Sequence, residues 1–202
     1  RVRTMQVAAV ALTVSAIGAG LVHDVWSLVF WRLVGGIGIG VASVIAPAYI
    51  AEISPAHVRG RLGSLQQLAI VLGIFVALAS DAYLAGHAGG AAQALWSGLA
   101  AWRWMFLVAA VPAVLYGLLV LGVPESPRYL VAKGDNAGAA DVLRRVLGLD
   151  GDALQKKIAE IDASLHAERR PRFADLRKPG GGLFPIVWVG ILLSVFQQFV
   201  GI

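Results

Sequence analysis

The chain contains no cysteine, and charged residues make up only 14% of its 202 residues. The absence of cysteine excludes a disulfide framework and thiolate metal sites, and it leaves the cellular compartment open. The low charge accompanies 58% hydrophobic residues and a mean hydropathy of +0.74, which lies outside the usual range of soluble proteins. We therefore predict a membrane protein.

No group of residues in the sequence is typical of catalysis or metal binding. The four histidines fall in expected loops without companion ligands at metal-site spacing. The glycines of residues 35–40 resemble a dinucleotide loop, but no strand precedes them and they lie inside an apolar run. Small residues four apart in such a run, here Gly36 and Gly40, instead let helix backbones approach closely. We expect no enzyme, no cofactor and no metal.

Apolar runs dominate the chain. A hydrocarbon core of about 30 Å takes about 20 helical residues to cross. The predicted spans are residues 5–22, 28–51, 62–84 and 102–123, with a fifth that starts near 183, and we expect residues 85–101 to be a loop. The chain starts without Met and ends inside an apolar run, so we expect it to be a piece of a longer chain.

Residues 124–182 form a polar insert between the fourth and fifth spans. Ser126 before Pro127 is typical of a helix start, Gly134 of a helix end, and Asn136 is placed to cap a second helix. Apolar residues at helical spacing predict a third helix, namely Leu154, Ile158, Ile161 and Leu165. We predict a small, solvated helical domain.

The basic residues are distributed unequally about the spans. Of the 17 lysines and arginines, two lie at the start of the chain, two after the second span and eleven in the polar insert. The turn at His23 and residues 85–101 hold none. Cytoplasmic loops carry an excess of Lys and Arg. We therefore predict a multi-pass cell-membrane protein whose N-terminus and residues 124–182 are cytoplasmic, and no nucleic-acid partner.

The stretch PAYIAEISPAHVRGRLGSLQQ, residues 47–67, joins the second and third spans. We predict a short loop that carries Glu52, Arg59 and Arg61, followed by Gln66 and Gln67 just inside the third span. A glutamine amide donates and accepts hydrogen bonds without a charge, which suits a neutral polyhydroxyl ligand. The alternative is that glutamines in the spans only connect neighbouring helices.

Three motifs resemble those of the sugar porter family of the major facilitator superfamily. Residues 32–62, RLVGGIGIGVASVIAPAYIAEISPAHVRGRL, are similar to its fourth and fifth helices. PESPRYLVAKG resembles the signature after its sixth helix, and FQQFVGI resembles its seventh. The motifs occur in family order and at family spacing. The resemblance implies an all-α membrane protein with a partial major facilitator bundle and a small cytoplasmic helical domain.

The resemblance also implies a division of the chain. Residues 1–123 would supply helices three to six, residues 124–182 a cytoplasmic linker domain, and residues 183–202 the start of helix seven. Half of the expected sugar site would then lie outside this sequence. We predict that the 202 residues alone do not transport, and that the full-length protein acts as a monomer.

The family's sugar-contacting glutamines match Gln67, Gln197 and Gln198. Gln67 is six residues from Arg61, about 9 Å, whereas Gln197 is fourteen from the start of its span, about 21 Å. Either the third span starts before residue 62, or Gln67 and Gln197 contact the ligand at different depths in the membrane.

The resemblance also implies functional roles for five charged residues. In proton-coupled members an arginine at the place of Arg32 faces an aspartate on the first helix; the alternative is that Arg32 snorkels to the headgroups.

Four further residues match family residues that form ion pairs and close the inner gate. The alternative is that their charges only fix the topology. Such exposed ion pairs are each worth about 0 to 1 kcal/mol. They are Glu52, Arg59, Glu125 and Arg128.

The function implied is transport of a monosaccharide or polyol by alternating access, with proton symport placed before facilitative uniport. A transporter of an organic acid and a non-transporting membrane sugar sensor remain alternatives. An organic acid favours extra cations in the cavity, and the spans offer only Arg32 and glutamines. The expected partners are the sugar, protons and the lipid bilayer.

Overall fold

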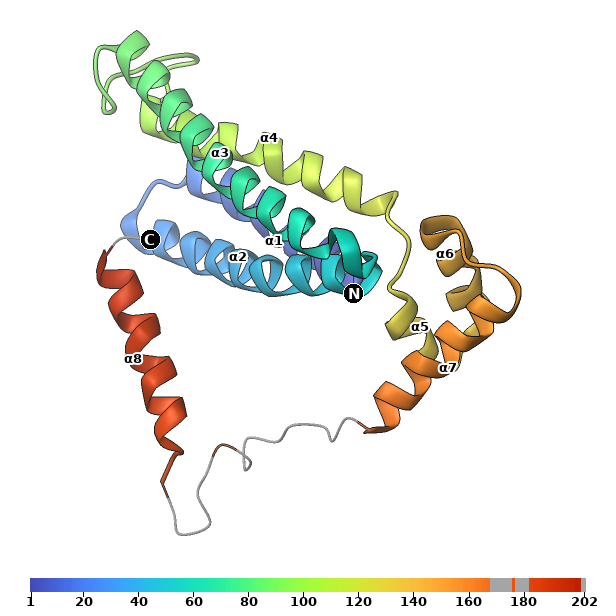
Figure 1. Cartoon of the computed structure of the whole chain (residues 1–202). Helices are drawn as coiled ribbons and strands as arrows, with labels where there is room; N and C mark the ends of the chain where they lie inside the picture. The colour runs from blue at the N-terminus through green and yellow to red at the C-terminus, as the bar shows by residue number, and fades with distance from the viewer. Residues whose placement is uncertain (168–175, 177–181, 201–202) are drawn as a thin grey trace. The chain divides into compact units, whose positions relative to one another are not determined.

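The structure is a computed structural model that describes residues 1–167, 176 and 182–200, without the side chains of 56, 197, 198 and 200. Within these residues every regular element is a helix, apart from isolated bridge residues such as the pair Ala94 and Ala100. The long helices are α1 (Val2–Leu21), α2 (Val25–Ile53), α3 (Ala56–Ala88) and α4 (Ala101–Leu121) (Figure 1). The others are α5 (Pro127–Ala132), α6 (Asn136–Leu147), α7 (Gly151–Ala167) and α8 (Pro185–Val200). The all-α prediction is confirmed.

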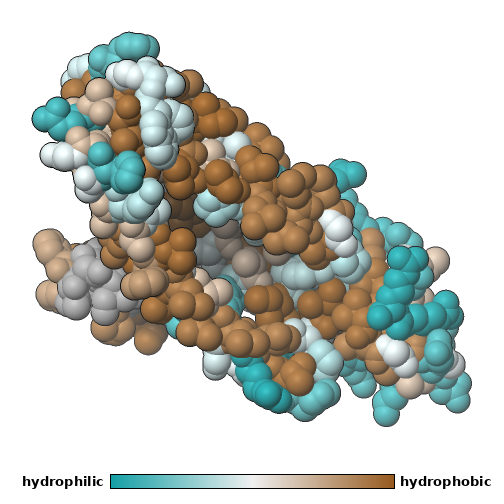
Figure 2. Space-filling model, turned by 90° about the horizontal axis from the view of Figure 1, so that it is seen from above, coloured by the Kyte–Doolittle hydropathy of each residue, from teal (hydrophilic) through white to brown (hydrophobic). Residues whose placement is uncertain are grey.

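The four long helices are each long and apolar enough to cross a membrane. They expose large apolar side chains outward, and both Ile37 and Phe75 are 68% exposed. Figure 2 shows hydrophobic residues covering most of the surface of this helix bundle, whereas many hydrophilic residues lie over α5 to α7. A helix that is hydrophobic all round belongs in a lipid or a large core. The surface therefore fits a bilayer.

The long helices alternate in direction, with α1 packed against both α2 and α4, and α3 against α4. The start of α1, the end of α2, the start of α3 and the end of α4 lie together, at what we call the Glu52 end (Figure 1). The turn between α1 and α2 lies at the opposite, His23 end. There the Asp24 carboxylate caps α2 by accepting from the Ser27 N–H at 2.8 Å.

The close contact between α1 and α2 involves glycines other than the predicted pair. A Cβ added at Gly35 lies 2.4 Å from the Ser15 hydroxyl oxygen, and one at Gly38 lies 3.1 Å from Leu12. A Cβ at Gly36 or Gly40 meets nothing within 4 Å among the described residues, so the predicted close approach at these two stays untested. Both glycine pairs satisfy helical spacing, and spacing alone does not tell which face of α2 meets its neighbour.

The predicted loop between the second and third spans was also too long. Helix α2 continues to Ile53 and α3 begins at Ala56, so Glu52 and the two arginines of this stretch are helical. The predicted loop 85–101 likewise shortens to 89–100, because α3 ends at Gly89, whose φ of +79° suits glycine. A fall in hydropathy marks the edge of the membrane, and it does not interrupt the helical hydrogen bonds.

In residues 124–167, the described part of the polar insert, the three predicted helices are present. Ser126 is the N-cap of α5, with Pro127 as the first helical residue. The N-cap of α6 is Asp135, whose carboxylate accepts from the Gly138 N–H at 2.9 Å, so the predicted cap at Asn136 was wrong by one residue. Apolar residues of α6 and α7 are buried, with Leu143 2% and Leu154 1% exposed.

Residues 1–162 form one compact unit and residues 163–202 form another. Helix α8 belongs to the second unit. It begins at Pro185, two residues after the predicted start of the fifth span, and its described large side chains are apolar.

Candidate functional site

A cluster of hydrogen bonds joins three helices at the Glu52 end. The Arg1 guanidinium donates to Glu52, with Nη2 2.7 Å from Oε1. The Ser126 hydroxyl donates to the other carboxylate oxygen at 2.5 Å. Ser126 is fully buried, at 0% exposure. The carboxylate at the end of α2 therefore connects the residue that precedes α1 to the N-cap of α5.

Glu125 caps the start of α1. Its carboxylate accepts from the Val2 N–H at 3.1 Å and from the Ser126 N–H at 3.0 Å. Desolvation raises the pKa of the Glu125 carboxyl, whereas these two backbone hydrogen bonds lower it. An anion at a helix N-terminus is also favoured by the helix dipole.

Apolar contacts surround this cluster. Val2, Met5, Tyr49 and Val120 are buried against one another. The Tyr49 hydroxyl donates to the Pro124 carbonyl at 2.8 Å, which ties α2 to the segment between α4 and α5. The ends of α1, α2 and α4 and the start of α5 thus form one junction.

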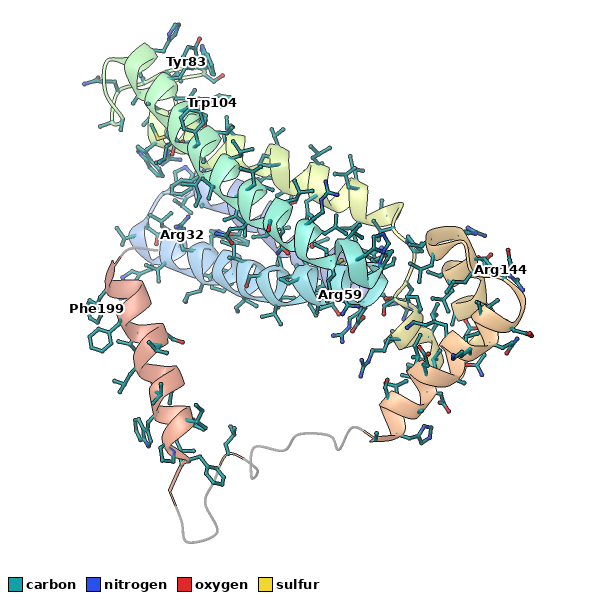
Figure 3. The ribbon with its side chains drawn as sticks, in the orientation of Figure 1. Arg32, Arg59, Tyr83, Trp104, Arg144 and Phe199 are labelled. Atoms are coloured by element: carbon teal, nitrogen blue, oxygen red, sulfur yellow. The ribbon has the colours of Figure 1, made fainter. Side chains whose placement is uncertain are left out.

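The predicted ion-pair set is only partly brought together here. Glu52 and Glu125 meet at the junction, with Arg1 and Ser126 as their partners. Arg59 is exposed in the first turn of α3 and forms no ion pair within the described part of the chain (Figure 3). Arg128 lies in α5, two residues after Ser126.

The sequence reasoning missed the partners at this junction. Arg1 was used only in the count of basic residues that predicts membrane orientation. Its positive charge was the one feature in the sequence that could have suggested a carboxylate partner. Ser126 was assigned as an N-cap, but its bond to Glu52 spans 74 residues of sequence, which local patterns do not reveal.

A second candidate region is an apolar cavity of about 460 Å³ between α1, α2 and α4. Three polar side chains line it, namely Ser15, Arg32 and Tyr116. The Tyr116 hydroxyl is buried and has no hydrogen-bond partner among the described residues. The Ser15 hydroxyl donates to the Trp31 carbonyl at 2.6 Å, next to Arg32. The cavity therefore holds one cation and one unsatisfied hydroxyl.

Arg32 lies in the half of α2 nearer the His23 end (Figure 3). Its guanidinium carbon is 5.5 Å from the centre of the Phe106 ring, within cation–π range. No carboxylate lies within ion-pair distance of it in the part of the chain that the structure describes. The predicted aspartate partner belongs to a helix outside this sequence, so that prediction remains untested.

Gln67 lies eleven residues after the start of α3, about 17 Å along the helix. Its side chain is exposed, and no hydrogen bond of its amide occurs among the described residues. Helix α3 starts at Ala56, before residue 62, which is compatible with the first of the two depth alternatives. The side chains of Gln197 and Gln198 lie outside the described residues, although their backbone belongs to α8.

Metal chemistry has no evident site here. Within the described residues no three His, Cys, Asp or Glu side chains are grouped so as to hold a metal ion.

The chain matches known proteins over its whole length. The family model described as "Sugar (and other) transporter" matches residues 1–202. The chain is 57% identical to the glucose transport protein of Synechocystis sp., covering 100% of this chain and 43% of that protein. It is 37% identical to the D-xylose-proton symporter of Escherichia coli, covering 94% and 36% respectively.

Solved structures agree with these matches. A partially occluded, inward-open xylose transporter XylE from E. coli superposes with a TM-score of 0.81 at 32% identity, covering 100% of this chain and 47% of that one. The chain thus spans about two fifths of the curated relatives named here, and about half of that structure. The chain belongs to the sugar transporter family, and its fold is a partial bundle of the major facilitator superfamily.

Proposed function

We propose that these residues are part of a transporter that moves a monosaccharide or a related polyol across a membrane by alternating access. The observation that carries the proposal is the family match over all 202 residues. In this assignment residues 1–123 supply helices three to six, residues 124–182 a cytoplasmic linker domain and residues 183–202 the start of helix seven. The full-length protein would act as a monomer in the bilayer.

The proposed sugar-binding residues are Gln67, Gln197 and Gln198. An unpaired amide in a membrane span is costly unless it faces a polar cavity or a ligand. Gln67 is eleven residues from the start of α3 and Gln197 is twelve from the start of α8, about 17 and 18 Å along their own helices. Such similar depths suit groups that contact one small ligand.

The proposed proton coupling depends on Arg32. Its lone charge in an apolar cavity requires an anionic partner, and a carboxylate that gains and loses a proton supplies a partner that changes during transport. The printed name of the E. coli relative is that of a proton symporter. A facilitative uniporter is the alternative; accumulation of sugar against its gradient distinguishes the two.

The proposed gate is the junction at the Glu52 end, which we assign to the cytoplasmic side because the basic loops lie there. Glu52 and Glu125 already join α1, α2 and α5 through short hydrogen bonds. Arg59 and Arg128 are proposed to belong to the same gate, and Arg59 to join the two carboxylates when the inner face closes.

The site is tested in the complete gene product, reconstituted in liposomes, by counterflow of labelled sugar. Gln67→Ala and Gln197→Ala are expected to weaken apparent sugar affinity at least tenfold, as loss of a buried hydrogen-bonding partner does. Gln66→Ala, one residue away on α3, is the matched control and should retain wild-type affinity. Wild-type affinity in both test variants would place the sugar site elsewhere.

A further inference from the structure

Both arginines that lie outside the basic loops contact aromatic rings of α4. Arg32 lies over Phe106 with 5.5 Å between the guanidinium carbon and the ring centre, and Arg103 lies over Trp102 at 5.0 Å. The two rings contact each other edge to face, with centres 6.1 Å apart and planes at 83°. Phe106 is therefore held by a neighbour one helical turn away while its face meets Arg32.

The backbone beneath Arg32 is also held in place. The Ser15 hydroxyl of α1 donates to the Trp31 carbonyl at 2.6 Å. Gly35 permits this approach, since a Cβ there would lie 2.4 Å from the same hydroxyl oxygen. These contacts hold α2 against α1 beside Arg32, whose guanidinium lies within reach of the Phe106 ring.

The charged and titratable groups near Arg32 are few. Among the cavity-lining residues, α1 contributes no titratable group, α2 contributes only Arg32, and α4 contributes Tyr116. Asp24, at the start of α2, is engaged by Ser27, with 2.6 Å between the hydroxyl and the carboxylate. In the described residues the ring of Phe106 is thus the group that stabilises the Arg32 charge.

We propose that Phe106 is a positioning residue for proton coupling: its ring holds Arg32 whenever the carboxylate partner is protonated, and competes with that carboxylate when it is charged. The inference rests on the proposed function, in which Arg32 takes part in proton coupling. A cation–π contact is weaker than an ion pair to a carboxylate but is independent of pH. The Arg32 guanidinium therefore has two alternative partners, the carboxylate and the Phe106 ring.

The sign of the effect follows from this competition. The ring stabilises Arg32 in the state in which the carboxyl is protonated. Removing the ring destabilises that state, so the ion pair between Arg32 and the charged carboxylate becomes relatively more favourable. Deprotonation then occurs at lower pH. The midpoint of the pH dependence of sugar affinity is expected to move down by about half a pH unit or more, given the usual strength of such contacts.

The test uses the complete gene product in proteoliposomes, with the same pH inside and outside. Counterflow of labelled D-glucose or D-xylose, whichever exchanges faster, gives the apparent affinity from pH 5 to pH 9. Phe106→Leu should lower the midpoint, and a single symmetric peak in size-exclusion chromatography in detergent shows that the variant is folded. Phe106→Met serves as the second non-aromatic variant if the first is unstable. Phe106→Tyr keeps the ring face and should keep the wild-type midpoint.

Two results overturn the inference alone: a wild-type midpoint in the stable non-aromatic variant, or a shift in Phe106→Tyr equal to that in Phe106→Leu. Arg32→Gln separates these from failure of the proposed function. If Arg32→Gln keeps the wild-type pH profile, or if neither sugar exchanges, the proposed coupling fails and the inference falls with it. If Arg32→Gln abolishes the pH dependence while the Phe106 variants do not move it, only the role of Phe106 is wrong.

Discussion

At the scale of single residues, the junction at the Glu52 end depends on partners far apart in the sequence. Ser126 could be assigned as an N-cap from its neighbour Pro127, because capping is local. Its bond to Glu52 could not, because that bond requires the end of α2 to meet the start of α5. Arg32 was identified because a charge in an apolar run is conspicuous, whereas the Phe106 ring that it meets is one of many apolar residues on α4.

At the scale of elements, hydropathy located the helices and misplaced their ends. The four long helices follow from apolar runs, yet α3 begins six residues before the predicted span, because the basic first turn of α3 is polar but helical. The sequence also does not tell which glycines of α2 face α1. It does not distinguish the four glycines of this helix, and only packing against α1 does so. They are Gly35, Gly36, Gly38 and Gly40.

The α1 and α2 contact gives a second prediction. Gly35→Ala places a Cβ 2.4 Å from the Ser15 oxygen, so either the Ser15 hydroxyl leaves the Trp31 carbonyl or the helices separate, and the free energy of unfolding should fall by about 1 to 3 kcal/mol. Gly36→Ala is the matched control, because its Cβ meets nothing within 4 Å. Denaturant unfolding in mixed micelles measures both. Equal stability of the two variants would show that α1 and α2 do not approach at Gly35.

At the scale of the whole molecule, the resemblance in three motifs was enough to identify the family, and the match over residues 1–202 confirms it. The sequence could not supply every residue of the proposed sugar site, since the chain spans about two fifths of the named curated relatives. The side of the membrane to which each end belongs follows from the distribution of basic residues and stays a prediction.

Cysteine labelling tests that prediction, because these 202 residues contain no cysteine and any cysteine elsewhere in the complete gene product can first be replaced by serine. Ser97→Cys introduces a thiol in the loop at the His23 end, and Lys133→Cys introduces one just after α5. In intact cells a membrane-impermeant maleimide should label the first and not the second, and permeabilisation should expose the second. Labelling in the reverse order would invert the topology and place the Glu52 junction outside.

Sugar counterflow by the complete gene product in liposomes tests the central claim most directly. Labelled D-glucose, D-xylose and inositol are each compared with a labelled organic acid, and the 202-residue chain alone is measured in parallel. We predict saturable exchange of at least one sugar or polyol by the complete protein, and none by the 202 residues alone. Exchange of the organic acid without any sugar, or saturable uptake by the short chain, would contradict the account.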